Sequence, residues 1–120
     1  MFIDARTLPD RHRIEADLAI IGGGAAGITL ARQFADRGVR VCLIESGGLS
    51  LDTDVQALYD GEIAGLAYPL TGNRLRYFGG STNHWGGFCR PLEAIDFEVR
   101  NWIPDSGWPF LIDELLGYYR

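Results

Sequence analysis

Three closely spaced glycines near the start of the chain restrict its fold more than any other feature. A strand is expected over 15–21, and its apolar part, 18–21, is expected to be fully buried. Directly after this run, Gly22, Gly24 and Gly27 form a G-x-G-x-x-G pattern. Gly22 permits a tight turn out of that strand, and Gly24 lets the backbone approach a diphosphate without a Cβ atom in the way. Gly27 allows the following helix to pack close to the sheet.

The segment after the glycines supplies the other parts of a βαβ unit. A helix is expected from Ala25 to about Arg37, ended by Gly38, and a second apolar strand over 39–44 leads to Glu45. The helical residues expected to face the sheet are Ile28, Ala31, Phe34 and Ala35.

These parts together predict a dinucleotide site. Unpaired N–H groups at the helix start favour a diphosphate, and Glu45 at the strand end can accept hydrogen bonds from ribose hydroxyls. A glutamate there, rather than an arginine, disfavours a 2′-phosphate and therefore NADP. The alternative is a structural βαβ unit whose glycine turn binds nothing.

Length and charge limit the architecture and the partners. The chain has 120 residues, 16 acidic side chains, 11 arginines and no lysine, for a net charge of −5. This charge argues against a nucleic-acid partner. A dinucleotide fold needs several parallel strands, and each crossover takes ~30 residues, but only two strong strands are visible. We therefore expect an irregular lead-in over 1–14 and an incomplete domain over 15–120, the amino-terminal part of a longer protein.

The sequence also predicts the compartment. Cys42 and Cys89 have neither metal-ligand nor C-x-x-C spacing, so no metal site and no disulfide framework is expected. The lead-in is polar and does not resemble a secretory signal. The longest run of apolar residues and glycines, 18–31, is too short to span a bilayer. The expectation is a cytoplasmic protein without a membrane segment.

A second glycine-rich segment lies further along the chain. The pairs Gly79-Gly80 and Gly86-Gly87 bracket the polar and aromatic residues 81–85, which predicts backbone held close to a large or flat ligand. Arg74 and Arg76 precede the segment and, if extended, point to the same side, where they could meet a phosphate or an acid.

The remaining stretches carry weaker signals. A short helix is expected over 52–59, a long excursion without periodicity over 60–73, and a last helix over 113–120 with Asp113 as its cap. The late aromatic residues are interpreted as packing residues rather than site residues: Trp102, Trp108, Tyr118 and Tyr119.

In combination, these segments resemble the glucose-methanol-choline (GMC) oxidoreductases, FAD enzymes that oxidise alcohols and sugars. The first similar stretch is IIGGGAAGITLARQFADRGVRVCLIESGG, with seventeen residues between Gly27 and Glu45. The second, RYFGGSTNHWGG, resembles the second glycine-rich flavin segment of that family. The third, SGWPFLIDELLGYY, is similar to a closing stretch of the sugar and polyol dehydrogenase branch. The first is common to many flavoproteins; the other two are more specific.

The resemblance implies an α/β fold: a Rossmann-like FAD-binding βαβ unit, with an irregular glycine-rich segment against the flavin, from the amino-terminal part of a larger two-domain flavoprotein. The implied FAD contacts comprise the first turn and the residues after the second strand, Gly22, Gly24, Ala25, Ala26, Gly27, Glu45 and Ser46. They also comprise the second segment, Arg76, Gly79, Gly80, Ser81, Thr82, His84, Trp85 and Gly86. Trp85 stands where relatives with a G-G-S-S motif commonly carry asparagine, so packing against the flavin is expected to differ here.

The resemblance also implies the reaction. GMC enzymes transfer a hydride from a CH–OH carbon of an alcohol, sugar or polyol to flavin N5, and a histidine takes the hydroxyl proton. That histidine lies in the carboxy-terminal region of the family, and neither His12 nor His84 matches it, so it is expected beyond Arg120. Some relatives bond the flavin covalently to a histidine at the position of His84; a non-covalent contact is the preferred interpretation. The substrate is an alcohol or sugar, with a separate electron acceptor.

Two alternatives remain open. An NAD-linked or disulfide-reducing flavoprotein would need a second G-x-G-x-x-G unit or a redox cysteine pair, and this stretch has neither. A non-catalytic nucleotide-sensing domain would use the same first turn without turnover.

Overall fold

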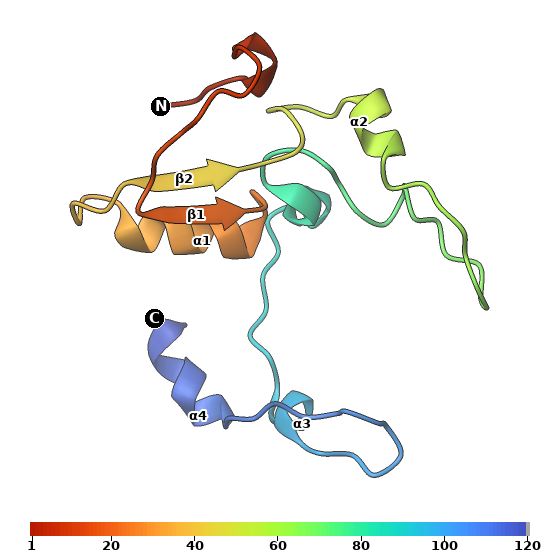
Figure 1. The fold of residues 1–120 in the computed structure, drawn as a ribbon. Helices are drawn as coiled ribbons and strands as arrows, with labels where there is room; N and C mark the ends of the chain where they lie inside the picture. Colours follow the sequence, from red (N-terminus) through yellow and green to blue (C-terminus); the bar gives the residue numbers. More distant parts are fainter. Residues whose placement is uncertain (120) are drawn as a thin grey trace. The chain divides into compact units, whose positions relative to one another are not determined.

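The computed structural model describes residues 1–119. The chain divides into two compact units, residues 1–87 and the residues from 88 onward, and each is described by itself (Figure 1). Within residues 1–119, no helix has both the length and the apolar character that a membrane crossing requires.

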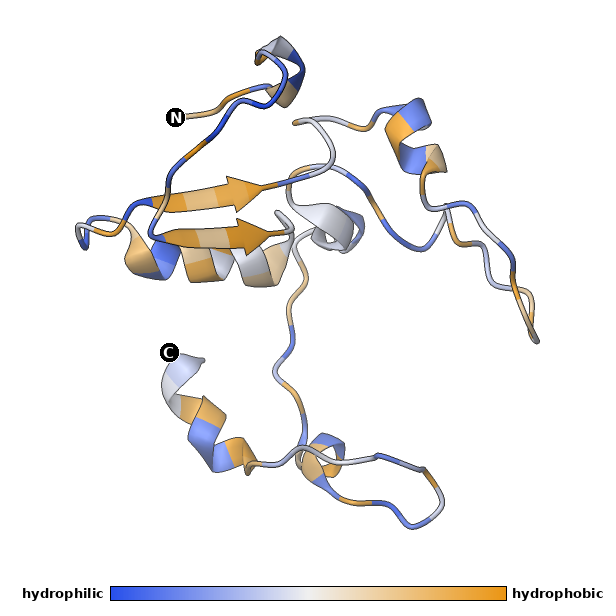
Figure 2. Ribbon diagram, in the orientation of Figure 1, coloured by the Kyte–Doolittle hydropathy of each residue, from blue (hydrophilic) through white to orange (hydrophobic). Residues whose placement is uncertain are grey.

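The first unit is built around the predicted βαβ element. Strand β1 (Leu18–Ile21) leads through the glycine turn into helix α1 (Ala25–Phe34), and strand β2 (Val41–Ile44) follows. The strands pair in parallel, with Leu18 opposite Val41. The helix lies against one face of this small sheet (Figure 1). Both strands are apolar along their length (Figure 2).

The two strands begin later than the sequence predicts. The expected start at Glu15 is wrong, because β1 begins at Leu18, and β2 begins two residues after Val39. The Asp17 carboxylate accepts hydrogen bonds from the backbone N–H of Arg40 at 2.9 Å and from its guanidinium NH2 at 2.9 Å. The N–H of Asp17 also donates to the carbonyl of Arg40 at 2.9 Å, but the N–H of Arg40 is taken by the Asp17 side chain, so the regular ladder begins after this pair.

The prediction of a fully buried first strand is wrong. Ile20 is buried, with 7% of its surface exposed, but Ile21 is 88% exposed. The reason is that α1 covers one face of the sheet, and alternate residues of a strand point to opposite faces. On the helix, the expected sheet-facing residues are half-buried: Ile28, Ala31 and Phe34.

Helix α1 ends earlier than expected. It stops at Phe34 rather than near Arg37, and Ala35, expected on the sheet-facing side, lies beyond it and is exposed. Asp36 and Gly38 then adopt positive φ angles of 61° and 74°. The turn back to β2 therefore begins at Ala35, three residues before Gly38. This is possible because an aspartate such as Asp36 can also adopt the left-handed conformation.

The other elements of the first unit are short. A 3-10 helix, η1 (Ala5–Thr7), interrupts the lead-in that was expected to be irregular. Helix α2 (Thr53–Ala57) lies within the predicted helix, and the carboxylate of Asp52 caps it by accepting from the next amides. The second glycine segment, expected to be irregular, forms a 3-10 helix, η2 (Gly80–His84). Residues 60–73 contain no helix or strand, as predicted.

The second unit contains three short helical segments. They are α3 (Ala94–Phe97), α4 (Ile112–Leu115) and η3 (Leu116–Tyr118). The predicted cap at Asp113 is wrong, since α4 begins at Ile112. The Glu114 carboxylate instead accepts from the backbone N–H of Leu111 at 2.9 Å, which satisfies an amide at the helix start. Arg120, the end of the predicted helix, lies outside the described residues.

The aromatic packing of the second unit differs from the prediction. Phe97, 8% exposed, is the buried residue, and its ring lies 5.9 Å from that of Phe110 in an edge-to-face arrangement. Trp102 and Tyr118, interpreted from the sequence as packing residues, are 77% and 84% exposed. Trp108 and Tyr119 are also exposed. The sequence alone does not show which of these rings are buried and which are exposed, because the helices are too short to show a periodic apolar face.

Candidate functional site

The two glycine-rich segments meet in the structure although more than fifty residues separate them in the chain. Gly24 and Gly79 form an isolated parallel bridge, and the N–H of Gly79 donates to the carbonyl of Gly23 at 2.8 Å. A Cβ atom on Gly80 would lie 3.3 Å from the Cα of Gly24. This distance is tighter than an ordinary contact and favours glycine at position 80, so the segments predicted separately form one site.

The carboxylate of Glu45 ties the first turn to the end of β2. Its Oε2 accepts a hydrogen bond from the N–H of Gly23 at 2.6 Å, and its Oε1 accepts from the N–H of Gly47 at 3.0 Å. The hydroxyl of Ser46 also donates to Oε1, at 3.3 Å. The side chain is therefore fixed at the mouth of the glycine turn rather than free in solvent.

This environment keeps Glu45 ionised. Partial burial by itself would raise the pKa of Glu45, but hydrogen bonds from the amides of Gly47 and Gly23 and from Ser46 outweigh it and lower the pKa below its ordinary value. Each carboxylate oxygen can accept more than one hydrogen bond, so acceptor capacity remains for a hydroxyl group of a ligand.

Gly22 and Gly27 shape the turn by steric necessity. Gly22 continues the strand by donating to the carbonyl of Ile44 at 2.8 Å and then turns with a φ angle of 103°, which favours glycine. A Cβ atom on Gly27 would lie 1.9 Å from the carbonyl oxygen of Gly22. The same atom would lie 3.4 Å from Cγ2 of Ile20 on β1, so the close packing of the helix against the sheet that the sequence predicts at Gly27 is present.

Gly24 is different, because a Cβ atom there would meet nothing within 4 Å. Its φ and ψ angles of −82° and −172° are open to any residue, so the fold itself does not require glycine. Gly24 is the N-cap residue of α1 and has no side chain that could accept a hydrogen bond from the helix. The first-turn amides of Ala25 and Ala26 have no partner within the helix. This open space at a positive helix end fits an anionic group such as a diphosphate.

The hydroxyl and amide side chains of η2 hold the second turn in place. Ser81 Oγ accepts from the N–H of Leu75 at 3.2 Å, and the hydroxyl of Thr82 donates to the carbonyl of Gly79. The amide of Asn83 donates to the carbonyls of Phe78 and Gly80 at 3.1 and 3.0 Å. These groups make the backbone of the segment rigid.

The end of the second segment lies apart from this network. His84, Trp85 and Gly86 are exposed, and Trp85 retains 65% of its surface. Gly86 has a φ angle of 58°. The structure therefore brings together the glycines, Glu45 and Ser46, whereas the predicted flavin contacts at 84–86 remain predictions.

Arg76 is held near the same turn through its backbone. A Cβ atom on Gly47 would lie 2.0 Å from the carbonyl oxygen of Arg76. The backbone N–H of Arg76 donates to Oε1 of Gln56, on α2, at 2.9 Å. The side-chain contact of Arg76 with a cofactor, expected from the sequence, remains a prediction.

Several residues of the site are absent from the sequence-based set. Gly23 and Gly47 donate the amides that hold Glu45, Asn83 fixes the second turn, and Gln56 anchors the segment before it. Gly23 and Gly47 could have been found from the sequence, because they lie in the glycine runs Gly22-Gly23-Gly24 and Gly47-Gly48. Asn83 lies within the segment 81–85 that the sequence singles out, although its role in fixing the turn was not predicted. No local pattern identifies Gln56, because its partners lie 15, 18 and 20 positions along the chain.

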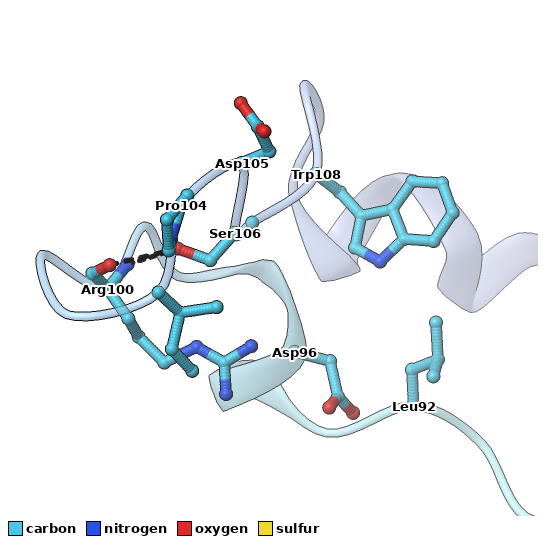
Figure 3. Close-up of a pocket in the computed structure, with 9 residues that line it drawn as sticks. Leu92, Asp96, Arg100, Pro104, Asp105, Ser106 and Trp108 are labelled. Carbon is cyan, nitrogen blue, oxygen red and sulfur yellow. Dashed lines mark hydrogen bonds between the residues drawn. The ribbon is translucent and has the colours of Figure 1, made fainter. Parts of the chain in front are cut away.

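The second unit has a separate pocket of about 540 Å³ (Figure 3). Asp96, Arg100 and Trp108 lie on its wall, and the guanidinium of Arg100 extends toward Asp96. The hydroxyl of Ser106 accepts from the backbone N–H of Arg100 at 2.8 Å and donates to its carbonyl at 3.1 Å, which closes the loop. No residue predicted from the sequence as a cofactor contact lines this pocket.

The first unit has the strand, glycine turn, helix and parallel strand of a dinucleotide-binding βαβ unit. The chain belongs to the family of FAD dependent oxidoreductases, whose family model matches residues 17–104. The cofactor is therefore FAD, and the matched range contains both glycine turns and Glu45. Neither the search of curated proteins nor the search of solved structures found a match.

Proposed function

We propose that the protein is an FAD-dependent dehydrogenase or oxidase of the GMC type that acts on the CH–OH group of an alcohol, sugar or polyol. The junction of Gly24 and Gly79 carries the proposal, because it joins a diphosphate turn to the segment that resembles the GMC flavin motif. The donor class rests on the resemblance of RYFGGSTNHWGG and SGWPFLIDELLGYY to that family.

Each part of the site has a role in this proposal. The amides of Ala25 and Ala26 at the start of α1 hold the diphosphate beside Gly24, and Glu45 accepts from the adenosine ribose. The hydrogen bonds from Gly23 and Gly47 support this role because they aim the carboxylate before the cofactor arrives.

In this proposal the turn at Gly79 and Gly80 contacts the flavin. The backbone at Gly79 and Gly80 runs beside the flavin, and Ser81 and Thr82 keep that backbone rigid through the hydrogen bonds described above. His84 follows on the same segment, and we assign it a non-covalent contact with the flavin rather than the role of proton acceptor.

FAD, when bound, accepts the hydride that the CH–OH carbon loses. The residues of this chain bind and orient the cofactor and provide no base for the hydroxyl proton in this proposal. The proposed location is the cytoplasm, supported by Cys42 and Cys89, which are free thiols. An electron acceptor that reoxidises the cofactor completes the cycle.

The test is an anaerobic spectrum of the full-length protein loaded with FAD. Addition of a panel of alcohols, sugars and polyols should bleach the flavin absorption, and amines and amino acids at the same concentrations serve as the control panel. Bleaching by a member of the first panel alone supports the proposal. Reduction by amines only, or flavin that no donor reduces, would contradict the donor class. A protein that binds adenine nucleotides but no flavin would indicate a sensing domain.

A further inference from the structure

One side chain of helix α2 joins three points of the segment that leads into the second glycine turn. The amide nitrogen of Gln56 donates to the carbonyl of Arg74 at 2.5 Å and to that of Thr71 at 2.7 Å. Its oxygen accepts from the backbone N–H of Arg76 at 2.9 Å. Gln56 is half-buried and lies 15 to 20 positions from these partners, so it fixes a contact between distant segments rather than a local turn.

The chemistry of this contact requires a primary amide. Two carbonyl partners need two N–H donors, the N–H partner needs one acceptor, and the glutamine amide supplies all three in one orientation. A carboxylate of the same length can accept from Arg76 but cannot donate to Arg74 or Thr71. The thioether of a methionine offers no donor and only a weak acceptor.

The segment held by this side chain continues directly into the junction of the two glycine turns. The N–H of Phe78 donates to the carbonyl of Gly48 at 2.9 Å, and the N–H of Gly79 donates to the carbonyl of Gly23 at 2.8 Å. One residue separates Arg76 from Phe78, so a displacement of the former moves both donors. The backbone that Gln56 fixes therefore carries the two bonds that tie the second turn to the end of β2 and to the first turn.

The same part of the chain attaches the segment a second time. The guanidinium carbons of Arg74 and Arg76 lie 4.6 and 4.8 Å from the ring centre of Tyr59, which follows α2 closely. These cation–π contacts hold the side chains of the two residues whose backbone Gln56 holds. The carboxylate of Asp52 caps the start of α2, so the amide of Gln56 projects from a helix that is itself fixed.

We propose that Gln56 is a positioning residue of the cofactor site, which holds the second glycine turn against the first through the backbone at 74–79. The inference rests on the proposed placement of the flavin beside Gly79 and Gly80, and not on the donor class. With the amide in place, FAD meets two turns that already have their bound arrangement. Without it, FAD has to order the second turn as it binds, which costs part of the binding free energy.

The first measurement is hydrogen exchange of the backbone amides by NMR in the full-length, flavin-free protein. Gln56→Met removes the hydrogen bonds of the amide and keeps a side chain of similar size. Gln33→Met, the same substitution at an exposed position of α1, is the matched control. The N–H of Gly79 should exchange about tenfold faster or more in Gln56→Met and at its original rate in Gln33→Met. Equal exchange in the two variants would overturn the proposal.

The second measurement is the dissociation constant for FAD, taken where urea unfolding shows each variant to be fully folded. The constant should rise by about tenfold in Gln56→Met and stay unchanged in Gln33→Met. Gln56→Glu keeps the shape and the acceptor but lacks both donors, so it should also weaken binding. If either variant of Gln56 binds FAD as tightly as the unsubstituted protein does, the amide does not position the site.

The visible circular dichroism of the bound flavin separates positioning from a merely structural role. At saturating FAD it should change in Gln56→Met and not in Gln33→Met. Gly80→Ala is the reference for a direct change of the second turn, because its Cβ atom would lie 3.3 Å from the Cα of Gly24. If Gly80→Ala changes the spectrum and Gln56→Met does not, the positioning role is overturned and the placement of the flavin stands. If neither variant changes it, the proposed placement of the flavin fails, and the positioning role fails with it.

Discussion

Substitution of Gly24 is expected to separate cofactor binding from folding. A Cβ atom at Gly24 meets no protein atom within 4 Å, and the backbone angles suit any residue. Gly24→Ala should therefore cost only the difference between glycine and alanine at a helix N-cap, about 0.5–1 kcal/mol. Gly24→Ser supplies a capping hydroxyl and should recover that loss.

Both variants should bind FAD poorly. The new Cβ atom fills the space beside the first amides of α1, where the diphosphate is expected, and displaces it from at least one charged hydrogen bond. Such a bond contributes about 1.5–3 kcal/mol, so the dissociation constant should rise by about tenfold to a hundredfold. Serine and alanine should behave alike in binding although they differ in stability.

Gly27→Ala should show the opposite behaviour. Its Cβ atom would lie 1.9 Å from the carbonyl oxygen of Gly22, so α1 must move away from the turn. Overpacking of this kind costs about 1–3 kcal/mol, and the stability of the fold should fall by that amount. Gly61→Ala is the control, because its Cβ atom makes only an ordinary contact, 3.7 Å from a carbon of Leu70.

Two measurements decide the outcome. Urea unfolding of the flavin-free variants gives the stability, and fluorescence titration with FAD gives the dissociation constant. If Gly24→Ser binds FAD as tightly as Gly61→Ala does, the diphosphate does not lie at the start of α1. If Gly27→Ala is as stable as Gly61→Ala, the close contact with Gly22 does not support the fold.

Three further predictions concern other residues. Glu45→Gln keeps the shape but loses the charge, and should weaken FAD binding by about 1–3 kcal/mol in the same titration; unchanged affinity would mean that another group holds the ribose. Asp17 is paired with Arg40, whose hydrogen bonds lower the pKa of Asp17 from 3.8 to about 2. The stability from this pair is therefore complete above about pH 5 and lost as the pH falls toward 2, and Asp17→Asn should remove that part of the acid sensitivity in thermal melts from pH 6 to pH 2. For His84, acid precipitation of the FAD-loaded protein should release the yellow colour into the supernatant; colour retained in the pellet would indicate a covalent bond.

The sequence was sufficient for the parts of the site that depend on local backbone rules. The G-x-G-x-x-G pattern between two apolar runs predicts the βαβ unit, and the structure has it at β1, α1 and β2. Gly27 was predicted from the need for close packing, and a Cβ atom there would indeed overlap the carbonyl oxygen of Gly22. These rules work because few other residues fit such positions.

The rest depends on contacts between distant segments. The Gly24–Gly79 bridge joins residues that no periodicity relates, and the hydrogen bond from Gly23 to Glu45 spans 22 positions. The prediction that β1 is fully buried was wrong, because the sequence of the strand shows that its residues are hydrophobic but not which of its faces a neighbouring element covers. The same holds for Trp102, which was interpreted as a packing residue from its aromatic side chain but is exposed in the structure.

The position of bound FAD tests the central claim most directly. In a crystal structure of the protein with FAD, the diphosphate oxygens should lie about 2.9 Å from the first-turn amides of α1, beside Gly24, with the adenosine ribose at the carboxylate of Glu45. FAD bound away from the junction of Gly24 and Gly79, for example in the pocket beside Arg100, would contradict the account.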